Sequence, residues 1–149
     1  MTVDLSWLAT YRSSEPHFGL ERMEALLALR GNPHLACPVI HLAGTNGKGS
    51  TLAHLRSLLE AKGLRVGVFS SPYLVSFNEQ ISIDGIPISD RDVETYLSLY
   101  QDLLAKNSSD QTLLGLTEFE LMTVMAFDYF AAKKPDVVVM EVGMGGRLD

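Results

Sequence analysis

The chain has 149 residues, 46% of them hydrophobic, which is enough apolar material for one domain with a real core. Its formal net charge of −6 argues against a nucleic-acid partner, because phosphate backbones need clustered Lys and Arg, but it allows small anionic ligands. The single cysteine, Cys37, excludes an internal disulfide, and with no leader and no apolar stretch of ~18 residues we expect a soluble cytoplasmic protein without a membrane partner.

Apolar spacing in the first half of the chain predicts helices and strands in alternation. The expected elements are a helix over 20–30, a strand over 39–43, a helix over 47–62 and a strand over 65–70. The second of these helices is expected to turn four leucines inward: Leu52, Leu55, Leu58 and Leu59.

The second half is expected to contain a loop over 71–78, a hairpin of 80–83 and 86–88, an amphipathic helix over 89–106, a buried helix over 117–134 and a strand over 136–142. Asp84-Gly85 is a strong hairpin signal. The last strand has apolar residues in succession, which is typical of a strand covered on both faces of a parallel sheet. We therefore expect an α/β fold, a mostly parallel sheet flanked by helices with a small β-hairpin, in a single domain over 1–149. A parallel strand normally continues into a crossover helix, so we expect the chain to be the front part of a longer protein.

A glycine-rich loop, Gly44-Thr45-Asn46-Gly47-Lys48-Gly49-Ser50, joins the first strand to the next helix. Glycines let backbone N–H groups approach phosphate oxygens, the helix N-terminus is electropositive, and a lysine can reach the outer phosphates. The spacing departs from the usual phosphate loop, because Leu42 takes the place of the first glycine and Gly49 separates Lys48 from Ser50. The alternative is a glycine-rich turn with an exposed lysine.

An acidic residue, Glu141, ends the apolar run of the last strand. An unpaired carboxylate there would cost several kcal/mol or lose its charge, and a neighbouring Mg²⁺ would favour the ionised form. A salt-bridged or capping glutamate is the alternative. The stretch Thr117-Glu118-Phe119-Glu120 fits a helix capping box, which explains Thr117 and Glu120 without excluding substrate contact. Phe119 is expected in the core.

Three stretches together resemble the folylpolyglutamate synthase / dihydrofolate synthase family, within the Mur-ligase-like ATP-dependent amide ligases. They are AGTNGKGS (Ala43 to Ser50), SSPYLVSFNEQI (Ser70 to Ile81) and MEVGMGGRLD (Met140 to Asp149). FGLER (Phe18 to Arg22) and TEFE (Thr117 to Glu120) also have counterparts there. The resemblance spans almost the whole chain but covers only the front part of a family member.

The resemblance implies an ATP site over Gly44 to Ser50, with Lys48 on the outer phosphates, and Mg²⁺ ligands at Ser71 and Glu141. It also implies a folate or pterin site, lined by Phe18, Thr117, Glu118, Phe119, Glu120, Leu148 and Asp149. Two positions depart from the family pattern: Tyr73 stands where many members have histidine, and His17-Phe18 precedes the GLER stretch. The family's third metal ligand, its modified lysine and its C-terminal domain would follow Asp149.

The implied reaction adds L-glutamate to a folate or dihydropteroate carboxylate through an acyl phosphate formed from ATP, with Lys48 and Glu141 as catalytic residues and a monomeric full-length enzyme. Three alternatives stay open. A cell-wall Mur ligase is disfavoured by Gly49 and the 71–79 loop. A nucleotide-dependent switch or binding module is the second alternative, and a GTPase of this kind is disfavoured by the lack of an Asn-Lys-x-Asp motif. The isolated chain could also be a catalytically inactive nucleotide-binding fragment. The choice between dihydrofolate and polyglutamate synthesis is left open.

Overall fold

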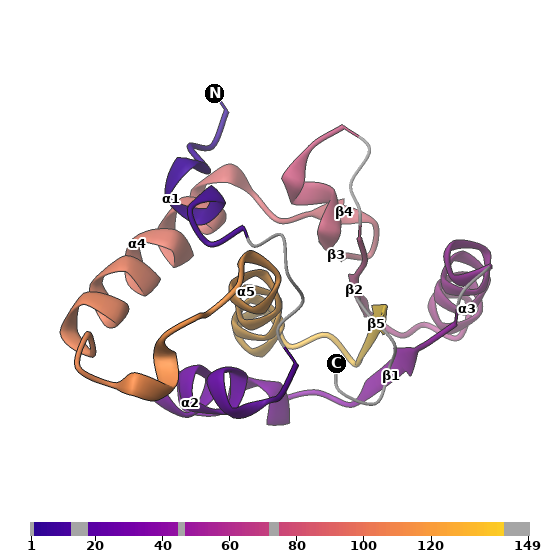
Figure 1. Ribbon diagram of the computed structural model, residues 1–149. Helices are drawn as coiled ribbons and strands as arrows, with labels where there is room; N and C mark the ends of the chain where they lie inside the picture. Colours follow the sequence, from indigo (N-terminus) through magenta and orange to yellow (C-terminus); the bar gives the residue numbers. More distant parts are fainter. Residues whose placement is uncertain (1, 13–17, 45–46, 72–74, 142–149) are drawn as a thin grey trace.

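The computed structural model describes residues 2–12, 18–44, 47–71 and 75–141, and within them one mixed five-stranded sheet in the order β1-β5-β2-β3-β4 (Figure 1). Strands β1 (Val39–Leu42), β5 (Val137–Glu141) and β2 (Val66–Phe69) run parallel. Strands β3 (Ile81–Ile83) and β4 (Ile86–Pro87) form an antiparallel hairpin on β2. The α/β fold and the mostly parallel sheet are as expected.

Helices cover both faces of the sheet. Helix α3 (Lys48–Ala61) lies alone on one face, and the remaining helices lie on the other (Figure 1). Those helices are α1 (Ser6–Ala9), α2 (Glu21–Leu29), α4 (Asp90–Lys106) and α5 (Glu118–Lys133). Short 3₁₀ turns occur at η1 (Pro33–Leu35), η2 (Phe77–Gln80) and η3 (Gln111–Leu113). No helix among the described residues is long and apolar enough to cross a membrane.

The position of β5 in the sheet explains why its apolar residues follow one another without alternation. Val137 and Val139 pack in the small cluster under α3, whereas Val138 and Met140 pack in the larger cluster under the other helices. Both faces of the strand are therefore buried, as in parallel sheets generally. The larger cluster also holds most of α5, which was expected to be a buried helix.

Gly67 lets α5 approach the sheet closely. A Cβ atom at this position would lie 2.8 Å and 2.9 Å from two ring carbons of Phe130 and 3.2 Å from a methyl carbon of Val138. Because no other residue type lacks a Cβ, glycine is required for this helix–sheet distance.

The expected inward position of Leu58 is wrong. Its side chain is 64% exposed, whereas Leu52, Leu55 and Leu59 are the α3 leucines that pack against the sheet valines. A narrow contact between one helix and three short strands covers only the stripe that those three residues form. The hairpin prediction is confirmed: Asp84 and Gly85 both have positive φ (50° and 77°), as a two-residue turn of this kind requires. Helix α1 was not predicted.

Candidate functional site

The carboxyl ends of the parallel strands meet at one edge of the sheet. Leu42 of β1 pairs with Glu141 of β5, and Phe69 of β2 pairs with Met140. The chain leaving β1 enters α3 on one face, and the chain leaving β2 returns to β5 through α5 on the other face. Ligands of open α/β sheets bind at such a reversal, outside the carboxyl ends of the strands.

The glycine-rich loop lies at this edge. Gly44 and Gly47 have positive φ (152° and 75°), and Gly47 is the N-cap of α3 without a side-chain cap. Gly47 therefore supplies no capping side chain to the first-turn amides of α3, and such amides can bind an anion. Within the described part of the chain, a Cβ on Gly47 or Gly49 would meet nothing within 4 Å.

The other loop residues are placed in part. Lys48 begins α3 through its backbone, and its side-chain position lies outside what the structure describes, as do Thr45 and Asn46. Ser50 belongs to the first turn of α3 and is exposed. The structure therefore describes the backbone of the predicted ATP loop on either side of Thr45 and Asn46, but no contact of the Lys48 side chain.

The structure brings together the two residues expected to hold Mg²⁺. The backbone N–H of Ser71 donates to Oε2 of Glu141 at 3.4 Å, and both residues are half-buried. A carboxylate and a hydroxyl supply hard oxygen donors, which suit Mg²⁺. No cluster of three or more His, Cys, Asp or Glu that could hold a metal occurs among residues 2–12, 18–44, 47–71 and 75–141. The pair therefore fits an ion that keeps several waters and takes phosphate oxygens as further ligands.

The first turn of α5 stands at the same edge. Its capping box is confirmed: Glu120 N–H donates to Thr117 Oγ1 at 3.2 Å, and Thr117 N–H donates to Glu120 Oε2 at 2.9 Å. Phe119 is half-buried against the core, as expected, with its ring centroid 5.9 Å from that of Phe69, the last residue of β2. The predicted folate stretch therefore contacts Phe69, which precedes Ser71 by two residues.

Two arginines that sequence reasoning missed engage the glutamates of this stretch. Arg22 pairs with Glu120 at 2.9 Å, with side chains 14% and 10% exposed, and the hydrogen bond to Glu120 raises the pKa of Arg22. Arg12 pairs with Glu118 at 2.8 Å in a more exposed position. The FGLER stretch contains Arg22, but Glu120 lies 98 residues away from it. The local sequence around Arg22 therefore does not indicate which residue it pairs with.

Of the remaining predicted folate residues, the structure describes Phe18 alone. Phe18 is 64% exposed, so it does not contribute to the core. Leu148 and Asp149 lie outside the described residues. The candidate site therefore consists of the β1–α3 loop, Ser71, Glu141 and the first turn of α5.

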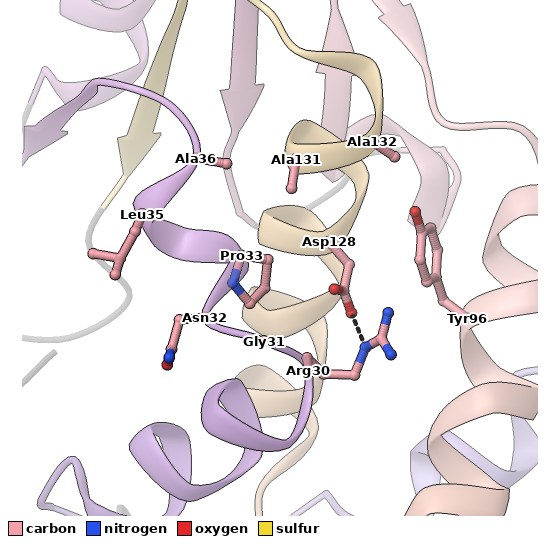
Figure 2. A pocket seen from close by; sticks show the side chains of 10 residues that line it. All are labelled: Arg30, Gly31, Asn32, Pro33, Leu35, Ala36, Tyr96, Asp128, Ala131 and Ala132. Atoms are coloured by element: carbon pink, nitrogen blue, oxygen red, sulfur yellow. Dashed lines mark hydrogen bonds and ion pairs between the residues drawn. The ribbon is translucent and has the colours of Figure 1, made fainter.

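A second polar cluster lies near the other end of α5 and lines an open groove (Figure 2). Asp128 is 6% exposed and accepts from Arg30 Nε at 3.0 Å and from Tyr100 Oη at 2.5 Å. Burial, reinforced by the charge of Asp128, raises the pKa of Tyr100 strongly and that of Tyr96 to about 12. Asp128 lies eleven residues after Thr117, about 16 Å along the helix, so this cluster ties helices together rather than forming part of the site.

Comparison with known proteins gives no match to a protein-family model. The dihydrofolate synthase/folylpolyglutamate synthase of Bacillus subtilis (strain 168) is 49% identical over 134 residues, which are 88% of this chain and 30% of that protein. The protein of the same description from Escherichia coli (strain K12) is 39% identical over 97% of this chain and 33% of its own length.

Solved structures agree with the curated relatives. The crystal structure of folylpolyglutamate synthase from Thermotoga maritima has a TM-score of 0.86 at 40% identity, covering 97% of this chain and 33% of that one. A folylpolyglutamate synthase complex with AMPPCP and folate has a TM-score of 0.89 at 36% identity, covering 97% and 35%. The chain spans about a third of the length of these relatives. In sequence and in fold, it is similar to a part of the folylpolyglutamate synthases / dihydrofolate synthases.

Proposed function

We propose that this chain is the N-terminal ATP-binding portion of an ATP- and Mg²⁺-dependent ligase that adds L-glutamate to a carboxylate of folate or dihydropteroate. The observation that carries the proposal is the strand register. Because Leu42 pairs with Glu141 and Phe69 with Met140, the glycine-rich loop, Glu141 and Ser71 lie side by side. The relatives named for this reaction, and the complex of one of them with AMPPCP and folate, support it.

The nucleotide would lie across the start of α3. The open amides of its first turn and the Lys48 side chain would take the phosphate oxygens, and the helix dipole favours their negative charge. Glu141 and the Ser71 hydroxyl would hold Mg²⁺, which when bound neutralises charge on the transferring phosphoryl group. These groups would position the substrates and neutralise charge on the phosphates, so no side-chain nucleophile is required.

The reaction would proceed in two transfers. An oxygen of the substrate carboxylate attacks the γ-phosphorus, the bond to the β–γ bridging oxygen breaks, and ADP leaves. The amino nitrogen of L-glutamate then attacks the acyl carbon, and the bond to phosphate oxygen breaks to leave an amide and inorganic phosphate. The first turn of α5, with Thr117 and Phe119, stands at the edge where the acceptor carboxylate must meet the γ-phosphate.

The test is ATP consumption with L-glutamate and either dihydropteroate or tetrahydrofolate as acceptor. It is run on this chain and on a polypeptide extended to the length of its relatives. We expect amide product from the extended polypeptide and nucleotide binding without turnover from the short chain. Absence of product from the extended polypeptide with either acceptor would refute the assigned reaction, and turnover by the 149-residue chain would refute its description as an incomplete catalyst.

A further inference from the structure

The ion pair between Arg22 and Glu120 is more buried than the neighbouring pair of Arg12 and Glu118. Arg22 Nε lies 3.2 Å from both carboxylate oxygens and Nη2 lies 2.9 Å from Oε1. Both side chains are about nine-tenths buried, whereas Arg12 in the adjacent pair is 68% exposed. A forked contact of this kind fixes direction as well as distance, which a lysine cannot do.

The same carboxylate closes the capping box of α5. Glu120 Oε2 accepts from Thr117 N–H at 2.9 Å while its two oxygens face Arg22. The amide of Glu118 also donates to the carbonyl of Tyr11 at 3.0 Å. The first turn of α5 is therefore joined to α2 by the ion pair of Arg22 and to the N-terminal segment by the hydrogen bond to Tyr11.

This turn is the part of α5 that reaches the site. Phe119 precedes Glu120 directly and contacts Phe69, two residues before Ser71. A shift of the turn would therefore move Thr117 and Phe119 relative to Glu141 and the glycine-rich loop. Neither the glycine-rich loop nor Glu141 belongs to α5, so we expect nucleotide binding to depend less on this turn than folate binding does.

We infer that Arg22 is a positioning residue for the acceptor substrate: closed on Glu120, it holds Thr117 and Phe119 where a folate can bind beside the phosphate loop. The inference rests on the proposed function and deepens it, because it separates the acceptor site from the nucleotide site. In this role Arg22 acts through Glu120 and not by contact with a substrate.

The informative variant is Arg22→Gln combined with Glu120→Gln. Glutamine at position 120 still completes a capping box, and the doubled change leaves no lone buried charge, so the fold is kept. Arg22→Lys keeps the charge and loses the fork. Arg56→Gln is the matched control, because it removes an arginine from the half-buried Arg56–Glu60 pair on α3.

Three quantities are measured on each variant: the dissociation constant for folate, that for AMPPCP with Mg²⁺, and amide hydrogen exchange across the first turn of α5. For the double variant we expect folate affinity to fall about tenfold or more, nucleotide affinity to stay within about twofold, and exchange to accelerate at residues 118–120. Arg22→Lys should fall between this variant and the wild type, and Arg56→Gln should match the wild type.

Two results would overturn the role of Arg22 alone: unchanged folate affinity in the double variant, or folate and nucleotide affinities that fall together. Wild-type protein that binds AMPPCP but no folate would instead refute the acceptor assignment, and the role of Arg22 with it. Binding of neither ligand by the wild type would refute the proposed function itself.

Discussion

Replacing Gly67 by alanine tests the helix–sheet packing that brings α5 to the site. The new Cβ would lie 2.8 Å and 2.9 Å from the Phe130 ring and 3.2 Å from Val138, closer than carbon atoms normally pack. Phe130 is 1% exposed and packs in the larger hydrophobic cluster, so its ring cannot move aside without disturbing other buried side chains. Overpacking of this kind costs about 1–3 kcal/mol, while alanine in place of glycine recovers about 0.5–1 kcal/mol of chain entropy.

We therefore expect Gly67→Ala to lower the free energy of unfolding by about 0.5–2 kcal/mol, measured by urea denaturation with an unchanged m-value. Combining it with Phe130→Leu provides the control, since the shorter side chain removes the ring atoms that clash. The double-mutant cycle should show the two changes compensating by about 1 kcal/mol. A Gly67→Ala protein as stable as the wild type, or strictly additive effects, would refute the close approach of α5.

Three further predictions concern the scaffold. Thr117→Ala removes the α5 cap and should cost about 1 kcal/mol of unfolding free energy in urea denaturation, with Thr95→Ala on the exposed side of α4 as a control that leaves it unchanged. Asp128→Ala leaves Arg30 and the buried Tyr100 hydroxyl without the carboxylate that accepts from them, and it should lower the free energy of unfolding by about 3 kcal/mol. Asp102→Ala on the surface of α4 should be near neutral. Equal effects of the two changes would contradict a stabilising role for the Arg30–Asp128–Tyr100 contacts. The pKa of Tyr96 is raised to about 12 in the folded state, above the ordinary value of 10.0, so its contribution to stability is complete below pH 10 and is lost as the pH rises from 10 toward 12. The midpoint of unfolding should fall over that pH range, less steeply in Tyr96→Phe than in the wild type. Identical slopes in the two proteins would mean that Tyr96 does not contribute to this pH dependence.

Elements that follow from the local order of apolar, polar and turn residues could be predicted from the sequence. The successive valines of β5 indicated a strand covered on both sides, and Asp84-Gly85 indicated the hairpin turn. The pairing of Ser71 with Glu141 was expected from the family resemblance, and the paired ends of β2 and β5 bring the two residues together. Leu58 shows the limit, because α3 has the spacing of a wide apolar face while the three parallel strands beneath it cover only a narrow stripe.

Long-range polar partners could not be predicted. Glu120 and Asp128 stand in a helix that reads as almost wholly apolar, and a buried carboxylate requires a partner, so each position indicated that one exists. Which arginine supplies it depends on how α2 packs on α5, since Arg22 and Arg30 are each 98 residues from their acceptors. The pairing follows from tertiary structure alone.

The most direct test of the account is Mg²⁺-dependent binding of AMPPCP to the wild-type chain, Glu141→Gln and Ser71→Ala, with Glu94→Gln on the exposed face of α4 as control. We predict that Mg²⁺ strengthens binding to the wild type and to the control by about tenfold or more, and that most of this gain disappears in Glu141→Gln and Ser71→Ala. An equal gain from Mg²⁺ in all four proteins would contradict a metal held between the tips of β2 and β5.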